Sequence, residues 1–298
     1  MRKNRLALIL SLSLPFCHTL AQAAGKDFAH WEALAKEART SEEKIDRYTK
    51  ALAVWTEDDG LLYKFYAHWS RGSAFAEKGD FTQALADCEK VLGMAPKSES
   101  GHLCRGDIYR AMSQADQAID EYNQALALNP LSIVAYSQRA SIYEHKKDFA
   151  RQEQDLTRAL KIDPRSVDLL NNRGVFYLGQ SATLKAINDF QAALNFNPKR
   201  HEAYDNLGFA YLELDKVEQA APNFRKAIEL DAKYADSHVG LAITLHRQGQ
   251  TEPAKKEMRQ AMSLEPLWMK GMDALKKKGY TYTPKQEKTI NELLAALR

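Results

Sequence analysis

A proline recurs every 34 residues through most of this 298-residue chain. The residues in this register are Pro96, Pro130, Pro164, Pro198, Ala232 and Pro266. Taking each as position 32 of a unit gives six units, 65–98, 99–132, 133–166, 167–200, 201–234 and 235–268. A fixed period of this length indicates that each unit is one supersecondary element that stacks on its neighbours. The repeat therefore has to be analysed before the chain is divided into globular domains.

Within each unit, side chains of the same size return at the same positions. Position 8 is small in all six units: Gly72, Gly106, Ala140, Gly174, Gly208 and Ala242. Position 27 is alanine in five units, and position 20 is alanine in all but the third, which has Gln152. Position 11 is aromatic in five units. Small and large residues at helical spacing predict two amphipathic helices per unit that approach at the small positions, and proline ends the second helix.

This pattern resembles the tetratricopeptide repeat (TPR) family over all six units, residues 65–268. The resemblance implies an all-α fold, a right-handed superhelical solenoid of antiparallel helix pairs. Residues 25–64 predict a degenerate N-terminal unit and a connector, which brings the total to about seven repeats. A terminal repeat is expected to depart from the pattern because one of its faces meets water. Residues 269–298 predict a C-terminal pair of capping helices, with helices expected over 267–280 and 284–298.

The first 23 residues have the pattern of a secretory signal peptide. Three cations precede a mostly apolar run at 6–16, and small residues favour cleavage after Ala23. A membrane anchor is the alternative, but eleven helical residues rise only ~16 Å, about half of the bilayer core. No later apolar run is long enough to span a bilayer. We therefore expect export to the periplasm, with no membrane insertion after the signal is removed.

Charge and motif content exclude several functions. The formal net charge is +3, and Arg2, Lys3 and Arg5 account for all of it, so the chain from residue 24 onward is neutral and gives no basis for nucleic-acid binding. The sequence contains no phosphate-binding loop, nucleophile elbow or metalloprotease motif, so neither catalysis nor a cofactor is expected. His68, His102 and His238 share position 4 on separate units, where packing is favoured over a common metal ion.

Two sets of polar residues predict contacts between helices. Position 7 is arginine and position 23 is acidic in the first four units, giving the pairs Arg71 with Asp87, Arg105 with Glu121, Arg139 with Asp155 and Arg173 with Asp189. This match favours an ion pair between the two helices of each unit. Cys88 and Cys104 fall on helices expected to be neighbours, and either a disulfide or two separate thiols is compatible with the spacing.

The first helices of TPR units line a concave surface, and the resemblance places positions 2, 5, 6, 9, 12 and 13 in it. The candidate peptide-binding residues are Gln138, Asn172, Val175, Leu178, Asp205, Asn206, Phe209, Leu212 and Ile243. Carboxamides can donate to and accept from an extended backbone, and Asn172 and Asn206 are similar in position to the asparagine ladder of the family. Nearby acids, namely Asp168, Glu202, Asp205 and Asp236, disfavour a clamp for a terminal carboxylate and predict a partner segment with apolar side chains and some positive charge.

The sequence thus predicts a non-enzymatic scaffold or adaptor of the cell envelope that binds a protein segment in this groove. Three alternatives stay open. In the first, the apolar residues only stiffen the solenoid. In the second, the stripe from Ile290 to Leu297 pairs with a second copy. In the third, the chain has an unrecognised catalytic site. The C-terminal lysines, Lys276, Lys277, Lys278, Lys285 and Lys288, predict either a solvated cap or a basic docking surface.

Overall fold

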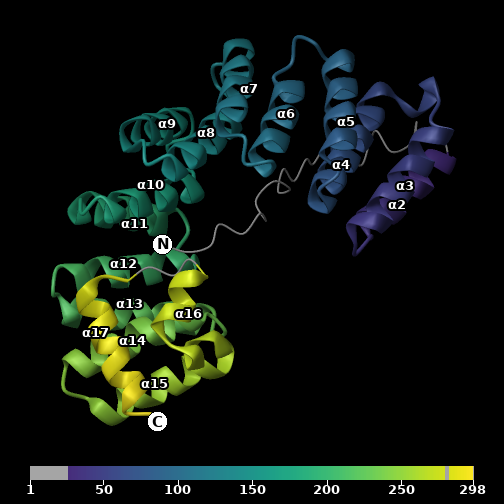
Figure 1. Ribbon diagram of the computed structural model, residues 1–298. Helices are drawn as coiled ribbons and strands as arrows, with labels where there is room; N and C mark the ends of the chain where they lie inside the picture. Colours follow the sequence, from purple (N-terminus) through teal and green to yellow (C-terminus); the bar gives the residue numbers. More distant parts are fainter. Residues whose placement is uncertain (1–25, 279–281, 298) are drawn as a thin grey trace. The chain divides into compact units, whose positions relative to one another are not determined.

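The computed structural model describes residues 26–278 and 282–297. The predicted signal peptide lies outside these residues. Within them, the chain consists of α-helices in consecutive antiparallel pairs and contains no strand (Figure 1). The all-α solenoid of helix pairs predicted from the repeat is therefore confirmed. None of the described helices is long and apolar enough to cross a membrane.

Each repeat consists of a first helix, called A, and a second helix, called B. The N-terminal pair is α2 (Lys26–Lys36) and α3 (Ser41–Val54), followed by the short 3-10 helix η1 (Glu57–Asp59). Repeats 1 to 3 are α4 (Leu61–Lys78) with α5 (Phe81–Met94), α6 (Ser100–Ala111) with α7 (Ala115–Leu128), and α8 (Ile133–His145) with α9 (Phe149–Ile162). Repeats 4 to 6 are α10 (Val167–Gly179) with α11 (Thr183–Phe196), α12 (His201–Glu213) with α13 (Val217–Leu230), and α14 (Ala235–Arg247) with α15 (Thr251–Leu264).

These helices form two compact units that divide after Ile162. In the N-terminal unit, buried side chains form separate small clusters between successive helices. In the C-terminal unit, one larger cluster runs through repeats 5 and 6 and includes side chains of the last helix, α17. The core of this protein is thus spread along the repeats, as expected for a solenoid in which each element packs against its neighbours.

The turn from the A helix to the B helix has the same backbone conformation in every repeat. Position 15 has a positive φ of 55° to 83° in all six, although only two of these residues are glycine: Gly79, Ser113, Lys147, Ser181, Asp215 and Gly249. A residue in this left-handed region ends an α-helix by satisfying its last carbonyl groups. The turn is therefore set by the repeat geometry, and it is a feature that the sequence columns did not reveal.

In repeats 2, 4 and 5, the glycine at position 8 receives the aromatic side chain at position 24 of the same repeat. A Cβ atom added to Gly106 would lie 2.7 Å from the ring of Tyr122, and one added to Gly174 would lie 2.5 Å from the ring of Phe190. Both distances are too short for carbon atoms. These three glycines therefore let an aromatic ring of the B helix lie directly on the backbone of the A helix.

The C-terminal region differs from its prediction in one respect. Residues 267–280 do not form one helix, but a 3-10 helix, η2 (Pro266–Lys270), followed by the short α16 (Met272–Lys277). Gly271 separates them with φ of +81°, a value incompatible with a continuous helix. The second predicted helix is α17 (Pro284–Ala295), which begins with a capping box formed by Thr283 and Gln286.

Candidate partner-binding surface

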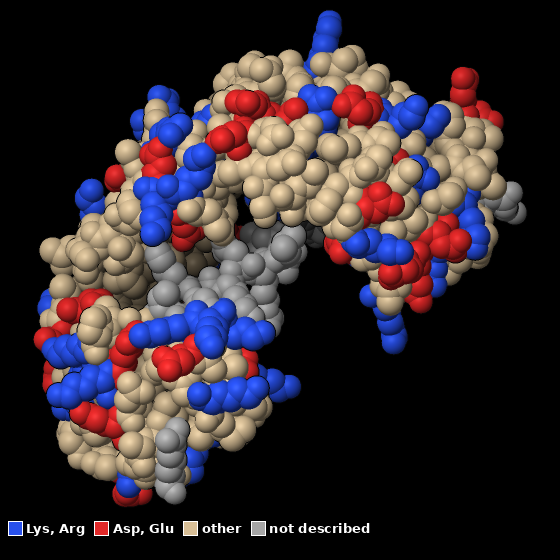
Figure 2. Space-filling model, in the orientation of Figure 1, with Lys and Arg blue, Asp and Glu red and all other residues tan. Residues whose placement is uncertain are grey.

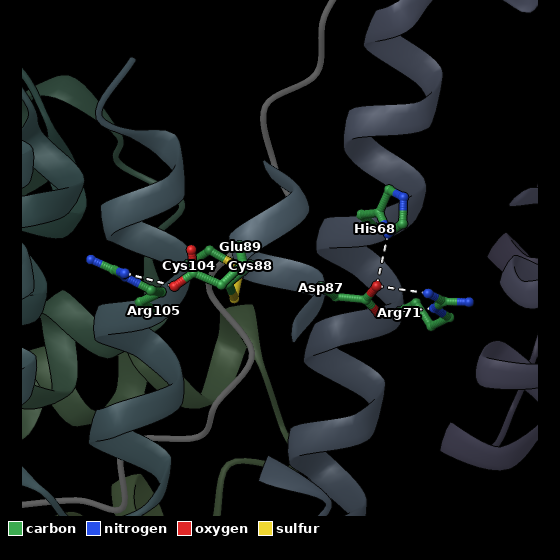
Figure 3. Close-up of a disulfide and its surroundings, with 7 residues drawn as sticks. All are labelled: His68, Arg71, Asp87, Cys88, Glu89, Cys104 and Arg105. Atoms are coloured by element: carbon green, nitrogen blue, oxygen red, sulfur yellow. Dashed lines mark hydrogen bonds and ion pairs between the residues drawn. A yellow bond between two sulfur atoms is a disulfide. The ribbon is translucent and has the colours of Figure 1, made fainter. Parts of the chain in front are cut away.

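The four predicted ion pairs between A and B helices are all present. The guanidinium to carboxylate distances are 2.7–2.9 Å in repeats 1 to 4. In repeat 1, His68 also contacts Asp87, with 2.7 Å between Nδ1 and the carboxylate (Figure 3). His102 and His238 pair in the same way with the position 23 acids Glu121 and Glu257. The histidines at position 4 thus have structural partners on separate repeats.

The arginine at position 7 also reaches the preceding repeat. Arg105 contacts Glu89 at 2.7 Å, and Arg139 donates to Asn123, both at position 25 of the repeat before. Arg105 and Arg139 therefore each fill the space where three helices meet: their own A and B helices and the preceding B helix. These arginines are occupied by their acids and do not form a free basic surface.

Asp87 gives this network a dependence on pH. Burial alone would raise the pKa of Asp87, but hydrogen bonds from Arg71 and His68 outweigh it, so the pKa lies below its usual value. A carboxyl group whose pKa is lower in the folded than in the unfolded state stabilises the fold. Its contribution is complete above the unfolded pKa, about 4, and is lost as the pH falls through the folded pKa. We therefore expect the stability advantage of the wild type over Asp87→Asn to be full at neutral pH and to shrink below about pH 4. Urea unfolding of both proteins across this range measures it, and a difference that stays constant would contradict the expectation.

Cys88 on α5 and Cys104 on α6 are joined by a disulfide (Figure 3). Their Cα atoms are 5.5 Å apart, and both residues are buried in the cluster between repeats 1 and 2. This bond links the B helix of one repeat to the A helix of the next. It therefore crosses an interface between repeats covalently.

The candidate groove residues of α10 lie on an accessible surface. Asn172 is exposed and makes no hydrogen bond to another described residue, while Val175 and Leu178 are partly buried. Asn206 on α12 donates to Asn171 at 2.8 Å and is also partly buried. Gln138, on α8 of the N-terminal unit, is partly buried. Of the two predicted rungs of the asparagine ladder, Asn172 is thus available to a partner and Asn206 is already engaged.

The candidate groove residues of α12 and α14 have a different environment. Leu212 and Ile243 are 2% and 0% exposed, and both belong to the cluster that contains Ile290, Leu293 and Leu294 of α17. The ring of Phe209 lies 4.9 Å from that of Phe224 and 6.1 Å from that of Tyr282. The chain's own C-terminal segment therefore covers the apolar floor that the sequence analysis placed in an open groove.

Polar contacts fix α17 along the same face. Gln286 donates to Glu213 at 2.7 Å, Lys285 pairs with Asp215, and His246 contacts Glu292 at 3.3 Å. The stripe of α17, for which pairing with a second copy was the alternative, is thus buried within the chain. Three of the five lysines of the predicted basic end also have acidic partners: Lys276 pairs with Glu287 at 2.7 Å, Lys285 with Asp215 and Lys288 with Glu292 at 4.0 Å.

The predicted acidic character of the groove is weaker than the sequence indicated. Arg200 lies between Asp168 and Glu202, at 2.7 Å and 2.9 Å. Asp205 is fully buried and accepts a hydrogen bond from Ser237. Since these acids have partners within the chain, the structure gives no electrostatic reason to expect a positively charged partner segment here.

Comparison with known families accounts for this architecture. Three family descriptions of the tetratricopeptide repeat match, over residues 45–99, over 106–146 with 210–249, and over 133–166 with 235–266. Together these ranges cover more than half of the chain. The chain belongs to the tetratricopeptide repeat family. No curated protein matches it in sequence.

Solved TPR structures have the same fold. A tetratricopeptide repeat protein from Parabacteroides merdae superposes with a TM-score of 0.57 at 16% identity, covering 91% of this chain and all of that one. YrrB, described as a TPR protein with an unusual peptide-binding site, has a TM-score of 0.50 at 19% identity, covering 65% of this chain and 98% of that one. MamA has a TM-score of 0.50 at 20% identity, covering 59% of this chain and 97% of that one. At these identities the likeness concerns the fold.

The charged residues of this TPR protein show neither a metal-binding group in the described ranges nor a separation of basic from acidic side chains on the face drawn in Figure 2. No group of three His, Cys, Asp or Glu side chains in the described ranges is placed to hold a metal ion. On the face drawn in Figure 2, basic and acidic side chains are interspersed, which agrees with the near balance of 42 basic and 39 acidic residues. The protein is thus suited to a role as an interaction scaffold, the general function that its TPR repeats support.

Proposed function

We propose that the protein is an exported, non-enzymatic scaffold that holds a segment of a partner protein on repeat 4. The segment would lie on the side of α10 that carries Asn172, Val175 and Leu178, which we call the A-helix face. The accessible carboxamide of Asn172 beside Val175 and Leu178 carries the proposal. A carboxamide can donate to and accept from one peptide group of a partner backbone. Partly exposed apolar side chains next to it would bury apolar atoms of the same segment, which is the main source of binding energy at most interfaces.

The contact between α17 and repeats 5 and 6 supports this choice of face. There the same groove positions already pack against the C-terminal segment: Ile243 shares a cluster with the apolar side of the amphipathic helix α17, and Phe209 contacts Tyr282 just before it. The A-helix face is thus able to hold a helix through apolar contacts at its centre and polar contacts at its rim. That YrrB is described as binding a peptide agrees with this use of the fold.

Two features support a location in the cell envelope. Residues 1–23 have the composition of a secretory signal. Cys88 and Cys104 are bonded, and structural disulfides persist in oxidising compartments. Osmotic release of the periplasm from the producing cells tests this part of the proposal, because a protein retained wholly in the cytosol would contradict it.

Site-specific photocrosslinking tests the binding face. A small diazirine amino acid at Val175 should give an adduct with a partner protein of the envelope, identified by mass spectrometry. The matched control places the same group at Leu184, an exposed residue of the B helix α11. Adducts from position 175 alone would support the proposal. If both positions capture the same proteins, or if neither captures any, the A-helix face of repeat 4 is not the binding surface.

The captured protein then permits a sharper test of Asn172. Replacing it with alanine should weaken binding by roughly 2- to 10-fold, the value of one net hydrogen bond. The helical content should not change, because this side chain is exposed and makes no hydrogen bond to a described residue. Binding that is equally tight after the replacement would remove the carboxamide from the proposed contact.

A further inference from the structure

A second surface, separate from the A-helix face, lies where α13, α14 and α15 meet. It is an open hollow with an apolar floor that includes Ile228, Leu241 and Leu245. Three cations, Arg225, Lys256 and Arg259, stand around it. Leu241 and Ile243 are two residues apart on α14, so they project about 200° from each other around the helix axis. The hollow therefore lies on the side of α14 opposite to the side that α17 covers.

At the hollow, repeat 6 departs from the arginine pattern of repeats 1 to 4. In repeat 3, Arg139 at position 7 pairs with Asp155 and reaches Asn123 at position 25 of the preceding repeat. In repeat 6, position 7 is Leu241, which is shorter and uncharged, and position 25 of the preceding repeat is Arg225. In repeat 6 the cation, Arg225, thus lies at the edge of the three-helix junction and not at its centre. The place that the guanidinium of Arg139 takes in repeat 3 is taken here by the shorter side chain of Leu241, which forms part of the apolar floor.

The acids near this hollow do not neutralise it. Glu257 is engaged by His238 at 2.7 Å, and Glu252 by Lys255 at 3.1 Å. Arg225, Lys256 and Arg259, in contrast, form no ion pair with any residue in the described ranges. All three are exposed, so each can turn its charge towards a ligand. The three cations around the apolar floor therefore outnumber the two carboxylates that line it, and both carboxylates already have partners.

We propose that this lateral hollow binds an acidic peptide segment that inserts one apolar side chain between its flanking carboxylates. The apolar floor would take the inserted side chain, and the three cations would pair with the carboxylates on either side. Charge complementarity of this kind contributes more to the choice of partner than to the strength of binding. Because the hollow is open and lies at the meeting point of three helices, it suits a side chain on a backbone that passes over it. The site is independent of the A-helix face, so both surfaces can be occupied together.

A titration followed by methyl NMR tests the proposal on the full chain. The probe is the peptide acetyl-Glu-Asp-Leu-Glu-Asp-amide, and the signals are the methyl groups of Ile228, Leu241 and Leu245. We expect saturable shifts of these signals that weaken as salt is added. In the triple variant Arg225→Glu, Lys256→Glu, Arg259→Glu, the affinity should fall by about tenfold or more. The matched control replaces three exposed lysines elsewhere with glutamate, Lys90, Lys161 and Lys199, and should bind the peptide as the wild type does.

A second variant fills the hollow without inverting its charge. Leu241→Arg combined with Arg225→Asn reproduces the arrangement of Arg139 and Asn123, with Glu257 as the acid. This variant should remain helical by circular dichroism and lose the shifts of Ile228 and Leu245. Equal binding by the charge-inverted protein, or equal binding of the lysine counterpart acetyl-Lys-Lys-Leu-Lys-Lys-amide, would overturn the proposal. Shifts caused by dodecanoate but not by the acidic peptide would also overturn it, because they would assign the hollow to an acyl chain.

Discussion

Replacing Cys88 and Cys104 together with alanine is expected to lower the free energy of unfolding by about 3 kcal/mol in the absence of reductant. The disulfide closes a loop with a sequence separation of 16 residues. A bond that closes such a loop restricts the unfolded chain and thereby disfavours unfolding. Urea denaturation followed by circular dichroism at 222 nm, a wavelength sensitive to helix, measures the change through the shift of the midpoint.

Reductant supplies the internal control for this experiment. Treating the wild type with dithiothreitol should shift its midpoint towards that of the double variant, whereas the variant should not respond. A wild-type midpoint that is unaffected by reductant would mean that the bond contributes nothing to stability. An equal response of both proteins would show that reductant acts elsewhere.

Gly240→Ala is expected to destabilise the protein by about 3 kcal/mol, because no space exists for the added carbon. A Cβ atom at this position would lie 2.1 Å from Cε1 of Phe224. The ring cannot move away easily, since it is fully buried, lies over Gly208 on one side and contacts Phe209 at 4.9 Å. Thermal or urea unfolding would record the loss, and an unchanged stability would mean that α13 and α14 can separate freely.

Gly93 provides the matched control for Gly240. It lies within α5, and a Cβ atom added there would meet no atom within 4 Å. Alanine at such a helical position reduces the entropy of the unfolded chain and should stabilise by roughly 0.4–1 kcal/mol. The same chemical change is thus expected to have opposite signs at two helical glycines, which separates steric overlap from helix propensity.

The repeat made the framework of this protein predictable from its sequence. A position that recurs in six units samples the same environment six times, so the small residues at position 8 and the arginines at position 7 could be assigned to contacts between helices. The four ion pairs were predicted for this reason, and all four are present. Arg105 and Arg139 also contact the preceding repeat. These contacts were not predicted, because the acceptor at position 25 is Glu89 in one case and Asn123 in the other.

The groove could not be predicted in the same way, because its environment depends on a segment outside the repeat. The resemblance to the TPR family placed Leu212 and Ile243 in an open groove, but here they share a cluster with side chains of α17. Nothing in the repeat columns shows where residues 282–297 return. An apolar stripe such as Ile290 to Leu294 indicates that the helix buries one face, but not which surface receives it.

The interruption at Gly271 was missed for a local reason. The apolar spacing from 267 to 280 fits a helix, but Pro266 begins η2 and Gly271 adopts a positive φ. A glycine in a helical pattern lowers the helix propensity by about 1 kcal/mol without revealing whether the chain will turn there.

The return of α17 also changes how the molecule can open. In a linear array, each end can unfold one unit at a time, because a terminal repeat is held only by its neighbour. At the C-terminal end of this protein, Gln286 bonds to Glu213, 73 positions earlier in the sequence, and Tyr282 contacts Phe209. Repeats 5 and 6 cannot lose α15 or α17 without exposing the cluster that they share. The last two repeats and the C-terminal segment therefore behave as one cooperative block, whereas α2 and α3 at the opposite end can fray alone.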